Sequence, residues 1–71
     1  MHQDYKTILR IIGTVELTNE GAIYPLCGIH YNRFVGILRD LQKWKWIDMY
    51  CGQYEFTDLG IEKYGEINGR I

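Results

Sequence analysis

The sequence predicts an α+β fold that is mainly α-helical, organised as one domain over residues 1–71. Apolar residues recur at the helical period of 3.6 in the first half of the chain. After residue 45 the pattern changes to two aromatic and β-branched runs around one glycine, which is typical of a hairpin. The length of 71 residues leaves no room for a second domain, and the 46% hydrophobic content is that of a folded chain.

The first predicted element is a helix from about Asp4, its N-cap, to Ile12. Gly13 is expected to end this helix, and the β-branched Val15 either extends it or forms a short strand. The residues that share one helical face are Tyr5, Ile8, Leu9 and Ile12.

Residues 14–28 predict a second helix that is short and irregular. Thr18 or Asn19 can cap its start, and Gly28 is expected to close it. Pro25 lacks an N–H and clashes with the preceding turn when it lies deep inside a helix. The helix therefore either ends before Pro25 or begins there, with the proline at its first position.

The third predicted helix, from Tyr31 to about Trp44, has the clearest pattern. Its inward face is expected to hold Phe34, Ile37, Leu38, Leu41 and Trp44. At 100° per residue a stripe on the opposite side faces solvent and consists of Asn32, Gly36, Arg39 and Lys43. Arg33 and Asp40 flank this stripe on one edge, and Val35 flanks it on the other.

Two strands are expected at residues 46–51 and 53–57, with Gly52 supplying the positive φ of a tight turn between them. Tyr54 and Phe56 share one face of the hairpin. Thr57 can cap a closing helix. Its inner side is predicted to consist of Leu59, Tyr64 and Ile67, and its early end is predicted from Gly65 and Gly69.

The order of these elements and several residues resemble the winged helix-turn-helix family. The residues that carry the resemblance are Phe34, Leu38 and Leu41, then Trp46 and Ile47, then Tyr54, Thr57, Gly60 and Tyr64. The pattern is similar to that of small winged helix regulators of archaea and of phage-like bacterial elements, and it covers about Tyr5 to Tyr64. It implies a three-helix core, a two-stranded wing hairpin and a short C-terminal helix.

The chain departs from this family pattern at two places. Lys45 stands where the recognition helix usually ends in glycine, and positive φ in a non-glycine residue costs roughly 1 kcal/mol or more. A continuous or 3₁₀ connection is therefore expected there. The wing, Asp48 to Glu55, contains no Lys or Arg, so we expect no ionic contact between it and phosphate.

The resemblance implies a sequence-specific regulator of transcription whose recognition helix, residues 31–44, enters the major groove of double-stranded DNA. Asn pairs bidentately with adenine and Arg with guanine. Gly36 has no side chain, so the backbone or sugar of the DNA can approach the helix closely there. Lys43, Lys45 and Arg33 would anchor phosphates. The candidate DNA-binding residues are His30, Asn32, Arg33, Gly36, Arg39, Lys43, Lys45 and Tyr50.

Charge is distributed unevenly along the chain, although the net charge is only −1. Residues 28–46 contain four Lys and Arg residues against Asp40 alone, whereas residues 48–66 are acidic. The basic middle favours DNA. The acidic balance and the uncharged wing tip favour the alternative, a protein-interaction module that has the winged helix fold and binds a protein partner instead of DNA.

Specific DNA binding by this chain would require two copies on a two-fold site, that is, a homodimer, because a monomer offers only about three or four phosphate contacts. The apolar residues available for such contact are Ile11, Val15, Ile61 and Ile67. Trp44, Trp46 and Tyr50 suit base stacking, but we interpret both tryptophans as packed and Tyr50 as the exposed aromatic.

Other classes of function have little support in the sequence. Cys27 and His30 form half of a zinc spacing, but Cys27 is better interpreted as a small buried side chain, and we expect no metal or other cofactor. The absence of a Ser/His/Asp set or a glycine-rich phosphate loop predicts a non-enzymatic protein, and we expect no ligand-sized cleft. No signal peptide or apolar run of about 20 residues is present, so we expect a cytoplasmic protein without membrane contact.

Overall fold

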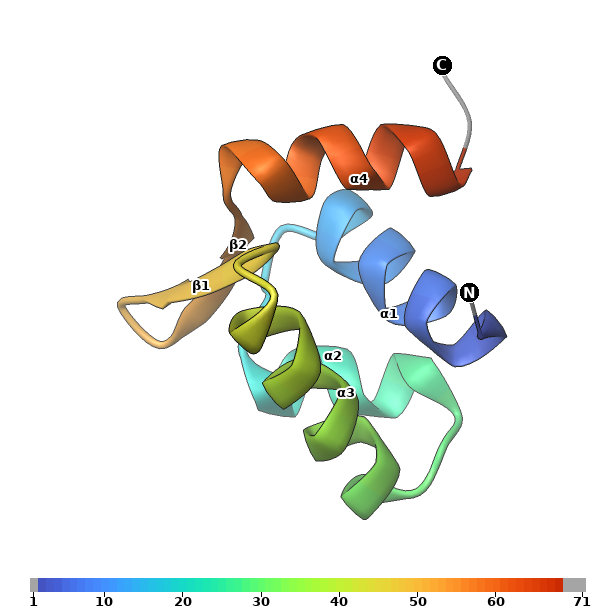
Figure 1. Cartoon of the computed structure of the whole chain (residues 1–71). Coiled ribbons are helices and arrows are strands. Elements are labelled where there is room, and N and C mark those ends of the chain that lie inside the picture. The colour runs from blue at the N-terminus through green and yellow to red at the C-terminus, as the bar shows by residue number, and fades with distance from the viewer. Residues whose placement is uncertain (1, 69–71) are drawn as a thin grey trace.

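The computed structural model describes residues 2–68 and shows a mainly helical α+β fold. Its elements are α1 (Gln3–Thr14), α2 (Glu20–Cys27), α3 (Tyr31–Lys43), β1 (Ile47–Tyr50), β2 (Gln53–Phe56) and α4 (Asp58–Asn68). Four helices and one two-stranded antiparallel hairpin thus make up the described residues. In Figure 1, α4 lies across α1, α2 and α3 lie on the other side of α1, and the hairpin projects sideways.

The core lies between α1, α2, α3 and the hairpin. Its buried side chains are Ile8, Leu9, Ile12, Ile23, Cys27, Phe34, Ile37, Leu38, Leu41, Ile47 and Tyr54. The predicted inner faces of the first and third helices are therefore confirmed, with Tyr5 half-buried against the core, except for Trp44, which is exposed. No helix in the described range 2–68 has the length and apolar character required to span a bilayer.

Helix α1 differs from its prediction at both ends. His2, rather than Asp4, is the N-cap, because its Nδ1 accepts a hydrogen bond from the Asp4 N–H at 3.1 Å. Gly13 does not end the helix. A Cβ at Gly13 would lie 3.0 Å from the Tyr64 ring and 3.1 Å from the Phe56 ring, so this glycine lets α1 pass close to both aromatic side chains.

Helix α2 runs through Pro25, so both predicted alternatives were wrong. Ile23 and Cys27 are four residues apart on the buried side of α2, and their burial holds this helix together across the proline. Asn19 is the N-cap, accepting from the Ala22 N–H at 2.7 Å. Gly28 closes the helix in the left-handed conformation, with φ of 67°, as predicted.

The connection after α3 is not continuous, which corrects the expectation at Lys45. Lys45 has φ of 66° and takes the left-handed conformation that usually requires glycine. Its N–H donates to the Gln42 carbonyl at 3.0 Å, and the Trp46 N–H donates to the Leu41 carbonyl at 3.0 Å. These two bonds form a Schellman motif, which satisfies the last carbonyls of α3 and turns the chain into β1.

The hairpin has a two-residue turn in which both Cys51 and Gly52 have positive φ, at 51° and 79°. Tyr50 pairs with Gln53 next to this turn, which is the geometry of a type I′ hairpin. Strand β1 is one residue shorter than predicted at each end, and β2 begins as predicted and ends one residue earlier. The segment before α2 also joins the hairpin: Thr18 accepts from the Tyr54 N–H at 3.2 Å, and its Oγ1 donates to the Tyr54 carbonyl at 2.6 Å.

Helix α4 begins as predicted, because Thr57 Oγ1 accepts a hydrogen bond from the Gly60 N–H at 3.0 Å. Its predicted inner face is corrected in part: Tyr64 and Ile67 pack against the core, but Leu59 is exposed. The buried residue at the start of α4 is Gly60 and not Leu59, and Gly60 lies beside the Trp46 backbone. The predicted early end was wrong at Gly65, which lies within α4, whereas Gly69 lies outside the described residues.

Candidate nucleic-acid interface

The stripe predicted on α3 is on the surface of the molecule. Asn32, Arg39 and Lys43 are exposed, and their side chains make no hydrogen bond or ion pair with any other residue between positions 2 and 68. Gly36 is half-buried between them, and a Cβ there would meet nothing within 4 Å. We call these four residues the outer stripe of α3. Its amide and cationic groups are free to contact a ligand.

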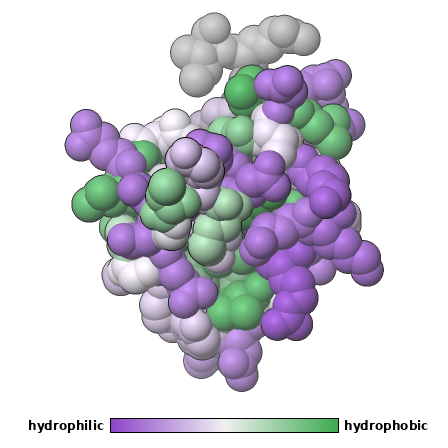
Figure 2. Space-filling view, turned by 90° about the vertical axis from the view of Figure 1, so that its left-hand side faces the viewer, coloured by the Kyte–Doolittle hydropathy of each residue, from purple (hydrophilic) through white to green (hydrophobic). Residues whose placement is uncertain are grey.

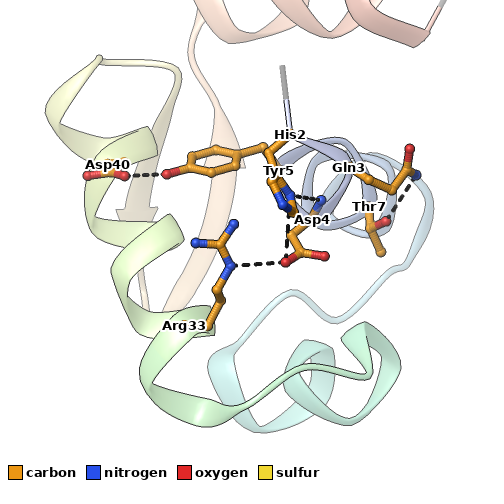
Figure 3. A network of polar contacts seen from close by, with 7 residues as sticks. All are labelled: His2, Gln3, Asp4, Tyr5, Thr7, Arg33 and Asp40. Atoms are coloured by element: carbon orange, nitrogen blue, oxygen red, sulfur yellow. Dashed lines mark hydrogen bonds and ion pairs between the residues drawn. The ribbon is translucent and has the colours of Figure 1, made fainter.

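Arg33 differs from the outer stripe because it is held by α1. Its Nε donates to Asp4 Oδ2 at 3.0 Å, and its guanidinium carbon lies 5.9 Å from the centre of the Tyr5 ring. Figure 3 shows this side chain reaching from α3 to the start of α1. Arg33 therefore has a structural role in the α1–α3 junction in addition to its predicted role as a phosphate anchor.

A second contact of this junction joins Tyr5 to Asp40. The Tyr5 hydroxyl donates to Asp40 Oδ2 at 2.5 Å (Figure 3), and this hydrogen bond is the main cause of a raised pKa for Tyr5. Asp40, the one acid on α3, is therefore engaged by α1. Neither contact was predictable from the sequence, because the partners are 29 and 35 residues apart and no local spacing connects them.

Trp44 lies at the C-cap of α3 and is 40% exposed, which corrects its placement in the core. Helix α3 ends at Lys43, so Trp44 does not continue the inner face of the helix. Its ring stacks on Tyr5 with centroids 5.6 Å apart, and it also contacts Trp46, with centroids 5.1 Å apart. Trp46 is half-buried against the core, as predicted.

His30 and Lys45 lie at the two ends of α3. His30 is the exposed N-cap residue, and its side chain makes no capping hydrogen bond. The Lys45 side chain is exposed, while its carbonyl accepts from Thr57 Oγ1 at 2.5 Å, which fixes the backbone of Lys45 against the start of α4. A helix of 13 residues is roughly 20 Å long, so the candidate residues that lie on α3 are spread over about that distance.

Tyr50 lies on the outer face of the hairpin and is 68% exposed, so it is the exposed aromatic that the sequence predicted. Asp48 and Glu55 are directly opposite one another on the same face. Cross-strand carboxylates repel one another, and the hairpin contains no Lys or Arg to offset them. In Figure 2, which shows the side from which the hairpin projects, apolar side chains form small separate patches among hydrophilic ones.

The surface contains two depressions, although no ligand-sized cleft was expected. One of about 300 Å³ adjoins Arg39 and has Glu20 and Tyr54 on its opposite wall. Glu20 accepts from the Tyr31 hydroxyl at 2.9 Å, which raises the Tyr31 pKa. The other, of about 530 Å³, lies between the end of α1 and the hairpin. The expectation was wrong because the projecting hairpin creates concave surface beside a small core.

The half zinc spacing does not form a site. Cys27 is buried, its thiol donates to the Ile23 carbonyl at 3.2 Å, and burial raises its pKa, so it is the small buried side chain that was predicted. Cys51 is exposed at the hairpin turn. Among residues 2–68 no group of three or more potential metal ligands occurs.

Comparisons of the chain with family models, with curated proteins and with solved structures give no match.

Proposed function

We propose that the chain is a winged helix-turn-helix domain that binds double-stranded DNA and regulates transcription without enzymatic activity. In this interpretation α2 and α3 are the helix-turn-helix, the hairpin β1–β2 is the wing, and α3 is the recognition helix. The carrying observation is the exposed outer stripe of α3, whose Asn32, Arg39 and Lys43 side chains have no partner between residues 2 and 68.

The chemistry of the outer stripe fits the edges of base pairs in the major groove. Asn32 and Arg39 are two helical turns apart, about 10 Å along the axis, which is close to three base-pair steps. The bidentate groups suit an adenine and a guanine at that separation. Gly36, between them, lets the helix approach the bases closely, and Lys43 and Lys45 suit phosphate contacts at the end of the helix.

Two copies on a two-fold operator would supply the affinity that one small domain lacks. Three of the four apolar residues expected at a dimer contact pack against the core of their own chain: Ile11, Val15 and Ile67. Ile61 is 59% exposed on α4 and remains available. We therefore propose the outer side of α4, and not α1, for a homodimer contact.

Fluorescence anisotropy with a random duplex pool, at two salt concentrations, tests the proposal. We expect binding that weakens steeply with salt, because phosphate contacts release counterions. Arg39→Ala should reduce affinity about 5- to 150-fold, from the loss of about 1–3 kcal/mol of base contact. Arg10→Ala, an exposed residue of α1 with the same change in charge, is the matched control and should change affinity far less. Absence of binding at low salt would contradict the proposal.

The competing proposal is a protein-interaction module with this fold. The observation that favours it is the hairpin, where Asp48 and Glu55 present two carboxylates on the face that also bears Tyr50. A partner with a basic surface would suit this face, whereas phosphate would not. Under this alternative no duplex binds at low salt, and Tyr50→Ala abolishes binding to a purified partner without lowering the free energy of unfolding.

A further inference from the structure

The depression of about 530 Å³ has the size of a small-molecule site, for which volumes of about 300 to 1,000 Å³ are usual. The last turn of α1 and the residues after it form one wall, with Ile12, Gly13 and Glu16. Strand β2 and the hairpin turn form the other wall. No residue of the outer stripe of α3 lines it, so it is separate from that stripe, although Tyr50, a candidate DNA-binding residue of the hairpin, is part of its lining.

The residues that line this depression have a distinct chemistry. Three of them are aromatic, of which Tyr50 is 68% exposed, Phe56 is half-buried and Tyr54 is buried in the core. Two are exposed carboxylates, Glu16 and Glu55, and none is Lys, Arg or His. Aromatic faces attract cations through the ring quadrupole, and carboxylates attract them by charge. Carboxylates beside aromatic rings repel anions and suit an organic cation that has an apolar hydrocarbon part.

The backbone of α1 adds to this preference independently of the side chains. The C-terminal end of a helix carries a partial negative charge of about half an elementary charge. No basic residue in the last turn of α1 offsets it. A Cβ at Gly13 would lie 3.1 Å from the Phe56 ring, so this glycine lets the last turn of α1 pass close to an apolar surface.

We propose that the depression between α1 and the hairpin binds an alkylammonium cation. The ammonium groups pair with Glu16 and Glu55, and the hydrocarbon chain packs on the exposed ring of Tyr50, which lies on the same face of the hairpin as Glu55. A free diamine and a lysine side chain of a protein partner present the same chemistry. The proposal does not depend on DNA binding, because none of these groups belongs to the outer stripe of α3.

Titration of the full chain with 1,4-diaminobutane, followed by two-dimensional ¹H–¹⁵N NMR without DNA, tests this site. We expect saturable shifts confined to residues 12–18 and 50–56. Glu16→Gln combined with Glu55→Gln should weaken binding at least 10-fold. The matched control is Glu62→Gln combined with Glu66→Gln, which makes the same change in charge on exposed positions of α4 and should leave binding unchanged. The spectra also report whether each variant is folded.

Three outcomes would overturn the site: no saturable shifts, equal shifts with the neutral 1,4-butanediol, or equal weakening in the α4 control. Titration with N-acetyl-lysine methylamide distinguishes the two sources of the ligand. Tighter binding of this compound than of the diamine supports a partner's lysine, and weaker binding supports a free amine. Tyr50→Ala should weaken either ligand, whereas Tyr50→Phe should not, because the ring face is retained.

Discussion

Two sides of α3 carry similar residue types and use them differently. On the side facing α1, Arg33 pairs with Asp4 and Asp40 accepts from Tyr5, so each polar group has a partner inside the molecule. On the outer stripe of α3, Arg39 and its neighbours have none between residues 2 and 68. The difference shows that position relative to α1 decides whether a polar side chain of α3 is engaged within the molecule or left exposed on its surface.

The largest expected effect is a loss of stability at Gly60, the buried glycine of α4 beside the Trp46 backbone. A Cβ at Gly60 would lie 1.8 Å from the Trp46 carbonyl oxygen, a backbone atom that cannot move aside. Gly60→Ala should therefore lower the free energy of unfolding by about 3 kcal/mol or more, because the joint between α3, the hairpin and α4 must shift. Urea unfolding measures this loss.

Gly36→Ala is the matched control for that substitution. Gly36 lies within α3, and an added Cβ meets open space. Alanine should raise the free energy of unfolding by up to about 1 kcal/mol through helix propensity. If Gly36→Ala were as damaging as Gly60→Ala, the outer stripe of α3 would be packed against other residues and the comparison of the two sides would be wrong.

The two arginines test the comparison most directly. Arg39→Ala should leave the free energy of unfolding unchanged and weaken duplex binding. Arg33→Ala should lower the free energy of unfolding by no more than about 1 kcal/mol, because its ion pair with Asp4 is partly exposed. It should weaken duplex binding less than Arg39→Ala does. Thermal unfolding and anisotropy on the same samples separate the two effects, and identical profiles for the two variants would contradict the comparison.

The Tyr5–Asp40 contact predicts a dependence of stability on pH. The pKa of Tyr5 is raised from its ordinary value of 10.0, mainly by the hydrogen bond to Asp40. A raised pKa means that the contribution is complete below pH 10 and is lost as the pH rises through the folded-state pKa. Tyr5→Phe should cost about 1 kcal/mol at pH 7 and reduce the loss of stability above pH 10.

The pH series needs one reference, because two other tyrosines also have raised pKa values, Tyr31 mainly through its hydrogen bond to Glu20 and Tyr54 mainly through burial. Tyr50→Phe supplies it, since Tyr50 is 68% exposed and makes no hydrogen bond with residues 2–68. Its alkaline unfolding curve should match that of the parent chain. A Tyr5→Phe curve that also matches the parent would show that the hydrogen bond to Asp40 does not stabilise the fold.

The sequence was sufficient to predict the elements that depend on local chemistry. The faces of α1 and α3, the caps at Asn19 and Thr57, and the turn at Gly52 follow from spacing and residue type. It was insufficient wherever tertiary contact overrides local preference. Burial of neighbouring residues carries α2 through Pro25, and the joint with the hairpin and α4 holds Lys45 at positive φ.

The candidate nucleic-acid interface also contains some features that the sequence predicts and others that depend on tertiary contact. The outer stripe of α3 was predictable, because a helical period assigns faces without reference to other elements. The capture of Arg33 by α1 and the exposure of Trp44 were not, because each depends on where α1 begins and where α3 ends. The depression beside the hairpin was also unpredictable, since its walls come from segments about 40 residues apart.

The smallest expected effect extends the comparison from α3 to the hairpin. Asp48 and Glu55 are cross-strand neighbours with the same charge, so Asp48→Asn combined with Glu55→Gln should raise the free energy of unfolding by about 0.2–1 kcal/mol. If the hairpin lies beside DNA as a wing, the same variant should bind duplexes a few-fold more tightly at low salt. That gain should vanish at high salt, because screening removes the repulsion that the carboxylates cause. A gain that persists at high salt would arise from altered packing and not from charge. Unchanged affinity at every salt concentration would place the hairpin away from DNA and leave α3 as the only surface in contact.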